Sequence, residues 1–498
     1  MRVRQFSWII VISYVLAGCG TNQPADNPPA LDTAPAAPTE SLQAAPSPAS
    51  VATATLSVPT ATPMIPEIGV SGLEIHGMDG LPLAGQAGLS WLRRNGLLWS
   101  EVEPEQGQRQ WDRVAYLEGE LQAYFSGGYQ TILVVRSTPG WAQELPGIPC
   151  GPIAEESLQA FASFMADAVA RYSRPPYNVH YYELWNEPDV DADLIPGDSQ
   201  YGCWGDSNDT EYYGGGTYAE MLRVVYPQIK AADPQAQVLV GGLLMDCDPV
   251  ILTETFPGSG VYNDCTPSRF LEGVLEAGGG DYFDGVSFHA YDYYQGEIGH
   301  YSNSNWHSAW DTTGPSMIAK VRYLRSLLAA YGYTGKILIN TENALLCGRD
   351  GSEDFCQEQA FQDTKASYLV QSYTMARVEG LTAIIWYDLH GWRGSGLVDE
   401  GGAPLPAYEA LSGQVTQLEH AAAWGRVTDG LIDGVRAFLF SRVDGWVWVV
   451  WAVTDQPQAI HLSSLPQGRY LLNGASVTPA QDIQVTTAPL YLEWASRP

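Results

Sequence analysis

From about residue 68 the chain alternates short apolar runs with stretches of helical periodicity, and this alternation constrains its fold most. The helical patterns include 111–125, 154–172, 218–232, 267–277, 316–331 and 357–379. The apolar runs number eight: 68–76, 88–95, 130–136, 179–186, 237–244, 283–289, 336–342 and 382–388. Because strands joined through helices run parallel in one sheet, this pattern predicts an α/β fold, a (β/α)₈ barrel, over residues 67–414. An open doubly wound sheet is the alternative, but no Gly-x-Gly-x-x-Gly turn follows the first run.

The pattern changes after about residue 415. Apolar runs at 435–439 and 446–453 are joined through Asp444-Gly445, which is a hairpin turn signal. Further short β-rich runs follow at 460–462, 469–472 and 490–493. Residues 415–498 are therefore expected to form a small antiparallel β domain behind the barrel.

The N-terminus reads as a targeting segment. Arg2 and Arg4 precede an apolar run over 6–16 that is too short to span a bilayer as a helix. The sequence Leu16-Ala17-Gly18-Cys19 follows, and it resembles the cleavage site of a bacterial lipoprotein, which implies that Cys19 carries the lipid. An ordinary signal peptide with an incidental cysteine is the alternative.

A tether is expected between this segment and the barrel. Residues 20–66 are rich in Pro, Ala, Thr and Ser and show no apolar periodicity, which predicts a disordered or polyproline-like linker. Together with residues 1–19, it predicts an exported protein held at the outer surface of a bacterial membrane by its lipid.

The cysteine count fits an oxidising compartment. Of the seven cysteines, six remain once Cys19 is set aside, and none forms a Cys-x-x-Cys pattern. An even number in an exported protein favours disulfides. Closeness in sequence, and then the remainder, suggests these pairs: Cys247–Cys265, Cys347–Cys356 and Cys150–Cys203. Six free buried thiols are the alternative.

Charge and aromatic content limit the partners. A formal net charge of −31 argues against nucleic acid and other polyanions, because long-range repulsion opposes their approach. The 16 tryptophans supply core volume, and rings of this kind also serve as stacking platforms for sugars.

Two glutamates end apolar runs on opposite sides of the predicted barrel. Glu187 follows the fourth run in Trp185-Asn186-Glu187-Pro188, and Glu342 ends the seventh in Asn340-Thr341-Glu342. Side chains at the carboxyl ends of barrel strands meet in one mouth. Two carboxyl groups about 5–5.5 Å apart suit retaining glycoside hydrolysis, in which one is a nucleophile and the other an acid and then a base.

The ordered set of motifs resembles clan A of the retaining glycoside hydrolases, with features of families 39 and 5. The resemblance covers residues 68–414 and implies that Glu187 is the acid/base and Glu342 the nucleophile. It also implies that Asn186 contacts the sugar 2-hydroxyl. Asn343 departs mildly from the pattern, in which a glycine usually stands at or near that position.

Further stretches extend the resemblance to other binding residues. Ser287-Phe288-His289-Ala290-Tyr291 implies Tyr291 as a hydrogen-bond donor to the nucleophile and His289 as a pocket residue. Trp386 in the eighth run implies the floor of the subsite for the cleaved sugar, and Trp141 follows the third run. Core packing is the alternative for both tryptophans, and a purely structural role is the alternative for His289.

Two arginines and a group of acidic residues also lie near these motifs. Of Arg93 and Arg94, which end the second run, Arg93 is favoured to point inward and hold Glu342 ionised. The acidic residues after Pro188 lack the glycine and distal glutamate of a calcium loop, so no metal is expected. The chemistry of two carboxyl groups needs no cofactor.

The sequence therefore predicts an exported retaining O-glycosyl hydrolase that acts on extracellular oligo- or polysaccharide, with a β linkage favoured. A non-catalytic surface glycan-binding protein and a transglycosylase that uses the same two glutamates are the alternatives. A serine esterase is disfavoured because no Gly-x-Ser-x-Gly elbow lies between a strand and a helix.

Overall fold

A computed structural model describes residues 64, 66–249, 265–295, 301–428, 431 and 433–498 of the chain. The predicted leader over 1–19, with Cys19, and nearly all of the 20–66 linker lie outside the described residues. Within the described part, no helix combines the length and the apolar character needed to cross a membrane.

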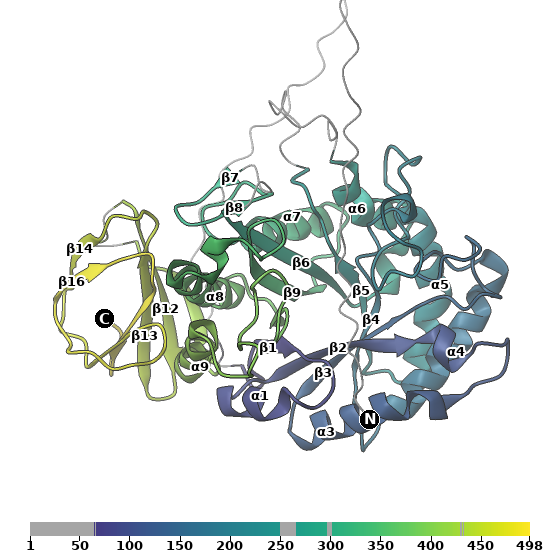
Figure 1. The fold of residues 1–498 in the computed structure, drawn as a ribbon, viewed down its shortest axis with the longest axis horizontal. Coiled ribbons are helices and arrows are strands. Elements are labelled where there is room, and N and C mark those ends of the chain that lie inside the picture. Colours follow the sequence, from purple (N-terminus) through teal and green to yellow (C-terminus); the bar gives the residue numbers. More distant parts are fainter. Residues whose placement is uncertain (1–63, 65, 250–264, 296–300, 429–430, 432) are drawn as a thin grey trace, which may run out of the picture. The chain divides into compact units, whose positions relative to one another are not determined.

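Eight parallel strands close into a barrel, as the alternating pattern predicts (Figure 1). Closure follows from the pairing of β1 with both β2 and β10 and of β5 with both β4 and β6. The barrel strands are β1 (Ser71–Glu74), β2 (Trp91–Leu98), β3 (Gln130–Arg136), β4 (Tyr181–Asn186), β5 (Gln237–Leu243), β6 (Gly285–Tyr294), β9 (Ile337–Cys347) and β10 (Ala383–Trp386). The short strands β7 (Tyr301–Ser302) and β8 (His307–Ser308) extend the sheet at β6.

Helices connect the strands and cover the barrel with their apolar faces. The α-helices are α1 (Leu81–Ala87), α2 (Trp99–Val102), α3 (Ala115–Ser126), α4 (Leu158–Tyr172), α5 (Gly215–Ala232), α6 (Phe270–Glu276), α7 (Met317–Ala330), α8 (Gln359–Val378) and α9 (Pro406–Leu418). Six 3₁₀ turns are also described: η1 (Trp111–Val114), η2 (Glu155–Ser157), η3 (Ala192–Leu194), η4 (Thr266–Arg269), η5 (Gly279–Tyr282) and η6 (Asp354–Gln357).

Two barrel strands run further than their apolar runs predict. β6 and β9 stay paired up to Tyr294 and Cys347. Glu342 therefore lies within β9, whereas the sequence pattern predicted it at the end of the strand. The cause is the apolar stretch after Glu342, which is fully buried and keeps the ladder intact. The two strands therefore form a wall that rises beyond Glu342.

The C-terminal segment forms the expected antiparallel β domain. Its main sheet has the order β11-β12-β13-β17-β15, and β14 pairs with β16 in a second sheet. The strands are β11 (Ala422–Arg426), β12 (Val435–Arg442), β13 (Gly445–Ala452), β14 (Gln458–His461), β15 (Gly468–Tyr470), β16 (Asp482–Val485) and β17 (Leu490–Trp494). The sheet packs on the last barrel helices, where the Tyr491 hydroxyl donates to Gln414 of α9 at 2.8 Å. The sequence pattern missed β11 and β16, which are short and have no long apolar run.

Three disulfides join the six cysteines in the expected pairs: Cys150–Cys203, Cys247–Cys265 and Cys347–Cys356. Each lies in or beside a loop at the carboxyl end of a barrel strand. The bridges therefore brace the loops around the mouth of the barrel.

Loop length predicts which bridge stabilises the fold more. Cys150–Cys203 spans a sequence separation of 53 and Cys347–Cys356 one of 9. The chain-entropy model gives about 4 kcal/mol for the longer loop and about 3 kcal/mol for the shorter. We expect the Cys150→Ala/Cys203→Ala variant to unfold at a lower temperature than Cys347→Ala/Cys356→Ala, measured by thermal denaturation without reductant. The reverse order would contradict this account of the two loops.

Candidate active site

The end of β4 has an unusual backbone. Trp185 and Glu187 have positive φ values of 75° and 49°. Leu184 still pairs with Val240 of β5, and the Glu187 N–H donates to the Gly242 carbonyl at 2.9 Å. A regular strand would send two consecutive side chains to opposite faces. The left-handed residues break this alternation, so Asn186 and Glu187 both reach the barrel mouth.

Glycines of β5 make room for this arrangement. A Cβ atom at Gly241 would lie 2.5 Å from the Leu184 carbonyl oxygen, and one at Gly242 would lie 2.1 Å from Nε2 of His289. Both distances are shorter than a carbon atom tolerates. The Gly241-Gly242 pair therefore allows the end of β4 and the imidazole of β6 to approach β5.

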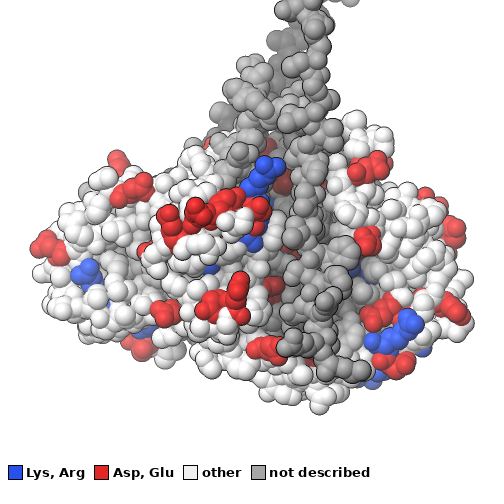
Figure 2. All heavy atoms as spheres, in the orientation of Figure 1, with Lys and Arg blue, Asp and Glu red and all other residues white. Residues whose placement is uncertain are grey.

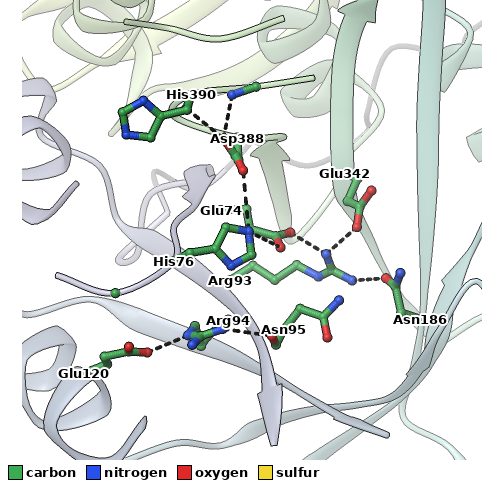
Figure 3. Close-up of polar contacts among 12 residues, drawn as sticks. Glu74, His76, Arg93, Arg94, Asn95, Glu120, Asn186, Glu342, Asp388 and His390 are labelled. Atoms are coloured by element: carbon green, nitrogen blue, oxygen red, sulfur yellow. Dashed lines mark hydrogen bonds and ion pairs between the residues drawn. The ribbon is translucent and has the colours of Figure 1, made fainter. Parts of the chain in front are cut away.

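Arg93 of β2 is the centre of the charge network (Figure 3). Its guanidinium is fully buried and donates a hydrogen bond to Glu342 at 2.6 Å. It also donates to three further side chains on other strands. Those acceptors are Glu74 at 2.5 Å, Glu183 at 2.5 Å and Asn186 at 2.6 Å. Arg94 points elsewhere and donates to Glu120 of α3 at 2.6 Å. The structure thus places Arg93 in the site, as expected, and Arg94 outside it.

Glu342 accepts hydrogen bonds on both carboxylate oxygens. Arg93 donates to Oε1, and the Tyr291 hydroxyl donates to Oε2. Burial and the negative charge of Glu342 raise the pKa of Tyr291 well above its ordinary value, so the hydroxyl keeps its proton. Both donors stabilise the ionised form of Glu342.

His289 lies between the two glutamates. Its Nδ1 is 2.8 Å from Oε1 of Glu187 and 3.3 Å from Oε2 of Glu342. Burial, with the charges of Arg93 and Lys320, lowers the pKa of His289 well below its ordinary value. The imidazole is therefore neutral, and an N–H at Nδ1 can be donated to Glu187.

The two glutamates differ in how readily they ionise. Burial raises the pKa of Glu187 well above its ordinary range, and the charges of Glu342 and Asp189 raise it further. Burial also raises the pKa of Glu342, but Arg93 and the Tyr291 hydroxyl act in the opposite direction. Glu342 therefore gives up its proton more readily than Glu187 does.

Glu187 and Glu342 lie close enough to act on one bound molecule. Among the described residues, one group of acidic and histidine side chains has its ligand atoms within 4.8 Å of one another: Glu187, His289 and Glu342. The same donor atoms have a geometry that a cation can use. However, both oxygens of Glu342 already accept hydrogen bonds from Arg93 and Tyr291, which disfavours a metal at this point.

A second layer of charged residues supports Glu187, and the sequence patterns did not single it out as such. Asp189 accepts from the N–H groups of Leu244 and Met245 at 2.9 Å each. Lys320 of α7 donates to the carbonyls of Leu244 and His289 at 2.7 and 2.8 Å, and burial lowers its pKa to about 8. The sequence did contain one sign of this role, because Lys320 interrupts the apolar positions of the predicted helix over 316–331.

Trp386 and Trp141, the two tryptophans predicted to bind sugar, differ in how deeply they are buried. Trp386 has no exposed surface and donates to the Ser395 carbonyl at 3.0 Å, so its ring offers no open face to a sugar here. Trp141 is half-buried, with its ring edge-on to Trp99 at 5.2 Å. Tyr387, which the sequence patterns did not identify, is also half-buried and lies 6.2 Å from Tyr291, ring to ring.

A polar pair lies beside Arg93 on the β1 and β10 side (Figure 3). Nε2 of His76 is 3.5 Å from Asp388 and 3.6 Å from Glu74. The hydrogen bond with Asp388 raises the pKa of His76. These residues follow the first and eighth strands, and the sequence patterns did not identify them.

Acidic side chains spread over the visible face of the molecule with few basic ones among them, in keeping with the net charge of −31 (Figure 2).

Comparison with known proteins identifies relatives by fold. No family model matches the chain, and no curated protein matches its sequence. Among solved structures, a family 39 glycoside hydrolase from the gut symbiont Bacteroides cellulosilyticus WH2 matches with a TM-score of 0.62 and 18% identity, over 86% of this chain and 82% of the other.

Two further solved structures match nearly as well. A GH30 endoxylanase from Clostridium papyrosolvens C71 has a TM-score of 0.55 and 12% identity, over 87% of this chain and 98% of that one. A monomeric β-xylosidase from Caulobacter crescentus CB15 has a TM-score of 0.54 and 16% identity, over 87% of this chain and 97% of that one. At these identities the likeness establishes the shared fold, and the family 39 match agrees with the resemblance of the sequence motifs.

The two neighbouring arginines provide a matched test of the charge network. Arg93→Gln leaves the carboxylates of Glu74, Glu183 and Glu342 without their shared cation, at a cost of about 3–5 kcal/mol in the free energy of unfolding. Arg94→Gln breaks one pair at the edge of the barrel, and we expect a smaller loss. Chemical denaturation measures both. Equal losses would show that Arg93 does not hold the network together.

Proposed function

We propose that this protein is a retaining O-glycosyl hydrolase that cleaves β-glycosidic linkages in extracellular oligo- or polysaccharide by double displacement. The observation that carries the proposal is the pairing of Glu187 and Glu342, whose oxygens lie within 4.8 Å in a buried site. Carboxyl groups about 5–5.5 Å apart favour attack by one of them, whereas inverting enzymes need a wider gap for water.

The first step forms a glycosyl ester. The Glu342 carboxylate attacks the anomeric carbon while the bond from that carbon to the leaving oxygen breaks. Glu187 gives its proton to that oxygen, so the leaving sugar departs as an alcohol. Arg93 and Tyr291 keep Glu342 ionised and oriented until it attacks.

The second step releases the sugar. Glu187, now a carboxylate, takes a proton from water, and the water oxygen attacks the anomeric carbon. The ester bond to Glu342 breaks, and both glutamates return to their starting forms. The configuration is inverted twice and is therefore retained.

Other residues orient the sugar. Oδ1 of Asn186 accepts from Arg93, which leaves the amide NH₂ as the donor for the sugar 2-hydroxyl. With its proton on Nδ1, His289 donates to Glu187 and fixes the direction of that carboxyl group. Structural neighbours include an endoxylanase, a β-xylosidase and a glucosidase, so aryl β-xylosides and aryl β-glucosides are the first substrates to test.

The location of the activity is part of the proposal. The Leu16-Ala17-Gly18-Cys19 segment supports export with a lipid on Cys19, and the three disulfides fit an oxidising compartment. A membrane-anchored enzyme at the cell surface would meet polysaccharide outside the cell.

Azide rescue tests the roles of the two glutamates. Glu342→Ala removes the nucleophile, and we expect turnover of an activated aryl β-glycoside to fall by at least about 10⁴-fold. Azide then fits the vacated space, attacks from the same side and gives the α-glycosyl azide, identified by proton NMR. The matched control is Glu101→Ala on α2, which we expect to turn over normally. Near-native turnover of Glu342→Ala, or binding of glycans by the wild type without hydrolysis, would contradict the proposal.

The pH dependence tests which glutamate carries the proton. Activity should fall as the pH drops below the pKa of Glu342, which must be ionised, and as it rises through the raised pKa of Glu187, which must be protonated. A dinitrophenyl glycoside needs no proton for its leaving group. With this substrate, kcat/KM of Glu187→Ala should keep the acidic limb and lose the basic limb. A basic limb that persists in Glu187→Ala would assign the proton to another group.

A further inference from the structure

Beyond the catalytic pair, β6 carries a row of side chains up the wall of the barrel mouth. His289, Tyr291 and Tyr293 alternate along the strand and share one face. The residues between them face the other way: Asp292 accepts from the Ser316 N–H at the start of α7, and Tyr294 packs on Phe361. Tyr293 is therefore one step further out than Tyr291, about 7 Å along the strand.

Arg393, in the loop after β10, continues this row. Its guanidinium lies 5.4 Å from the ring centre of Tyr293 and 5.3 Å from that of Trp392. The side chain is 6% exposed, its Nη2 has no hydrogen-bond partner, and it forms no ion pair with any residue the structure describes. Two aromatic rings thus hold this cation in place.

The loop that carries Trp392 is fixed at several points. The Trp392 N–H donates to Oγ of Ser395 at 3.0 Å, and the carbonyl of Arg393 accepts from the Cys347 N–H of β9 at 2.8 Å. Trp386 of β10 donates to the Ser395 carbonyl. A backbone held in this way presents the indole in one orientation.

The indole is nevertheless open to solvent. Trp392 is 54% exposed, and among the described residues it is the one tryptophan in the exposed class. Arg393 covers one side of the ring system, which leaves the other accessible. The C–H face of a sugar packs against such a ring, whose faces carry partial negative charge.

We propose that Trp392, backed by Arg393 and Tyr293, forms a separate sugar-binding subsite on the β6 and β10 side of the mouth. This inference rests on the proposed function and deepens it. Two guanidinium–ring steps and one strand step separate the indole from Tyr291. Trp392 therefore binds a different sugar unit from the one attached to Glu342, and the substrate is an oligosaccharide or polysaccharide chain that extends over this rim.

The test compares short and long substrates. We expect Trp392→Ala to lower kcat/KM for xylo- or gluco-oligosaccharides of four to six units by about 2- to 10-fold, and to leave the aryl monoglycoside unchanged. Trp392→Phe retains a ring and should recover most of the loss. The matched control is Trp446→Ala in the C-terminal sheet, where Arg497 also lies over a tryptophan ring. It should leave both substrates unaffected.

Two results would overturn the proposed subsite. Equal loss on the monoglycoside and on the longer substrates would assign Trp392 a structural role and overturn the subsite, as would no loss on either. If the wild type hydrolyses nothing, the proposed function fails separately. Affinity electrophoresis in soluble xylan and mixed-linkage β-glucan then tests the subsite alone: slower migration of the wild type than of Trp392→Ala supports it, and identical migration overturns it.

Discussion

The buried guanidinium of Arg93 is the interaction on which the rest of the site depends. One positive charge is shared by Glu74, Glu183 and Glu342, which come from strands β1, β4 and β9. Burying three carboxylates without a cation would remove a large share of the stability of an ordinary domain. Arg93 therefore ties distant strands together, and its charge also favours the ionised form of Glu342.

Closure of the barrel gives this charge network its geometry. β2 carries Arg93 and β9 carries Glu342, and they lie on either side of β1 and β10. Glu187 approaches from the other direction because the left-handed residues at the end of β4 fit against the glycines of β5. His289 then lies between the two glutamates, so Glu187 and Glu342 reach one site from different sides of the barrel.

The alternation of apolar runs with helical patterns was enough to predict the barrel, and the short β-rich runs predicted the C-terminal β domain, because both depend on local pattern. The three disulfide pairs were suggested by the closeness of the cysteines in the sequence. Glu187 and Glu342 could be predicted because each comes directly after a run of apolar residues in the sequence. The supporting residues could not be predicted in this way: Glu74, Glu183 and Lys320 matter through contacts between strands and helices far apart in the chain. Trp386 shows the reverse, since a tryptophan at a strand end suits stacking, yet tertiary packing buries it completely.

The central claim is that Glu342 forms a covalent bond to the sugar while Glu187 handles the proton. Trapping that intermediate tests it most directly. A 2-deoxy-2-fluoro-β-glycoside with a dinitrophenyl leaving group slows hydrolysis of the ester, so the labelled protein accumulates and can be digested and sequenced by mass spectrometry. The account predicts one fluoro-sugar per chain, attached to Glu342. A label on Glu187, or release of dinitrophenol with no covalent label under any condition, would contradict it.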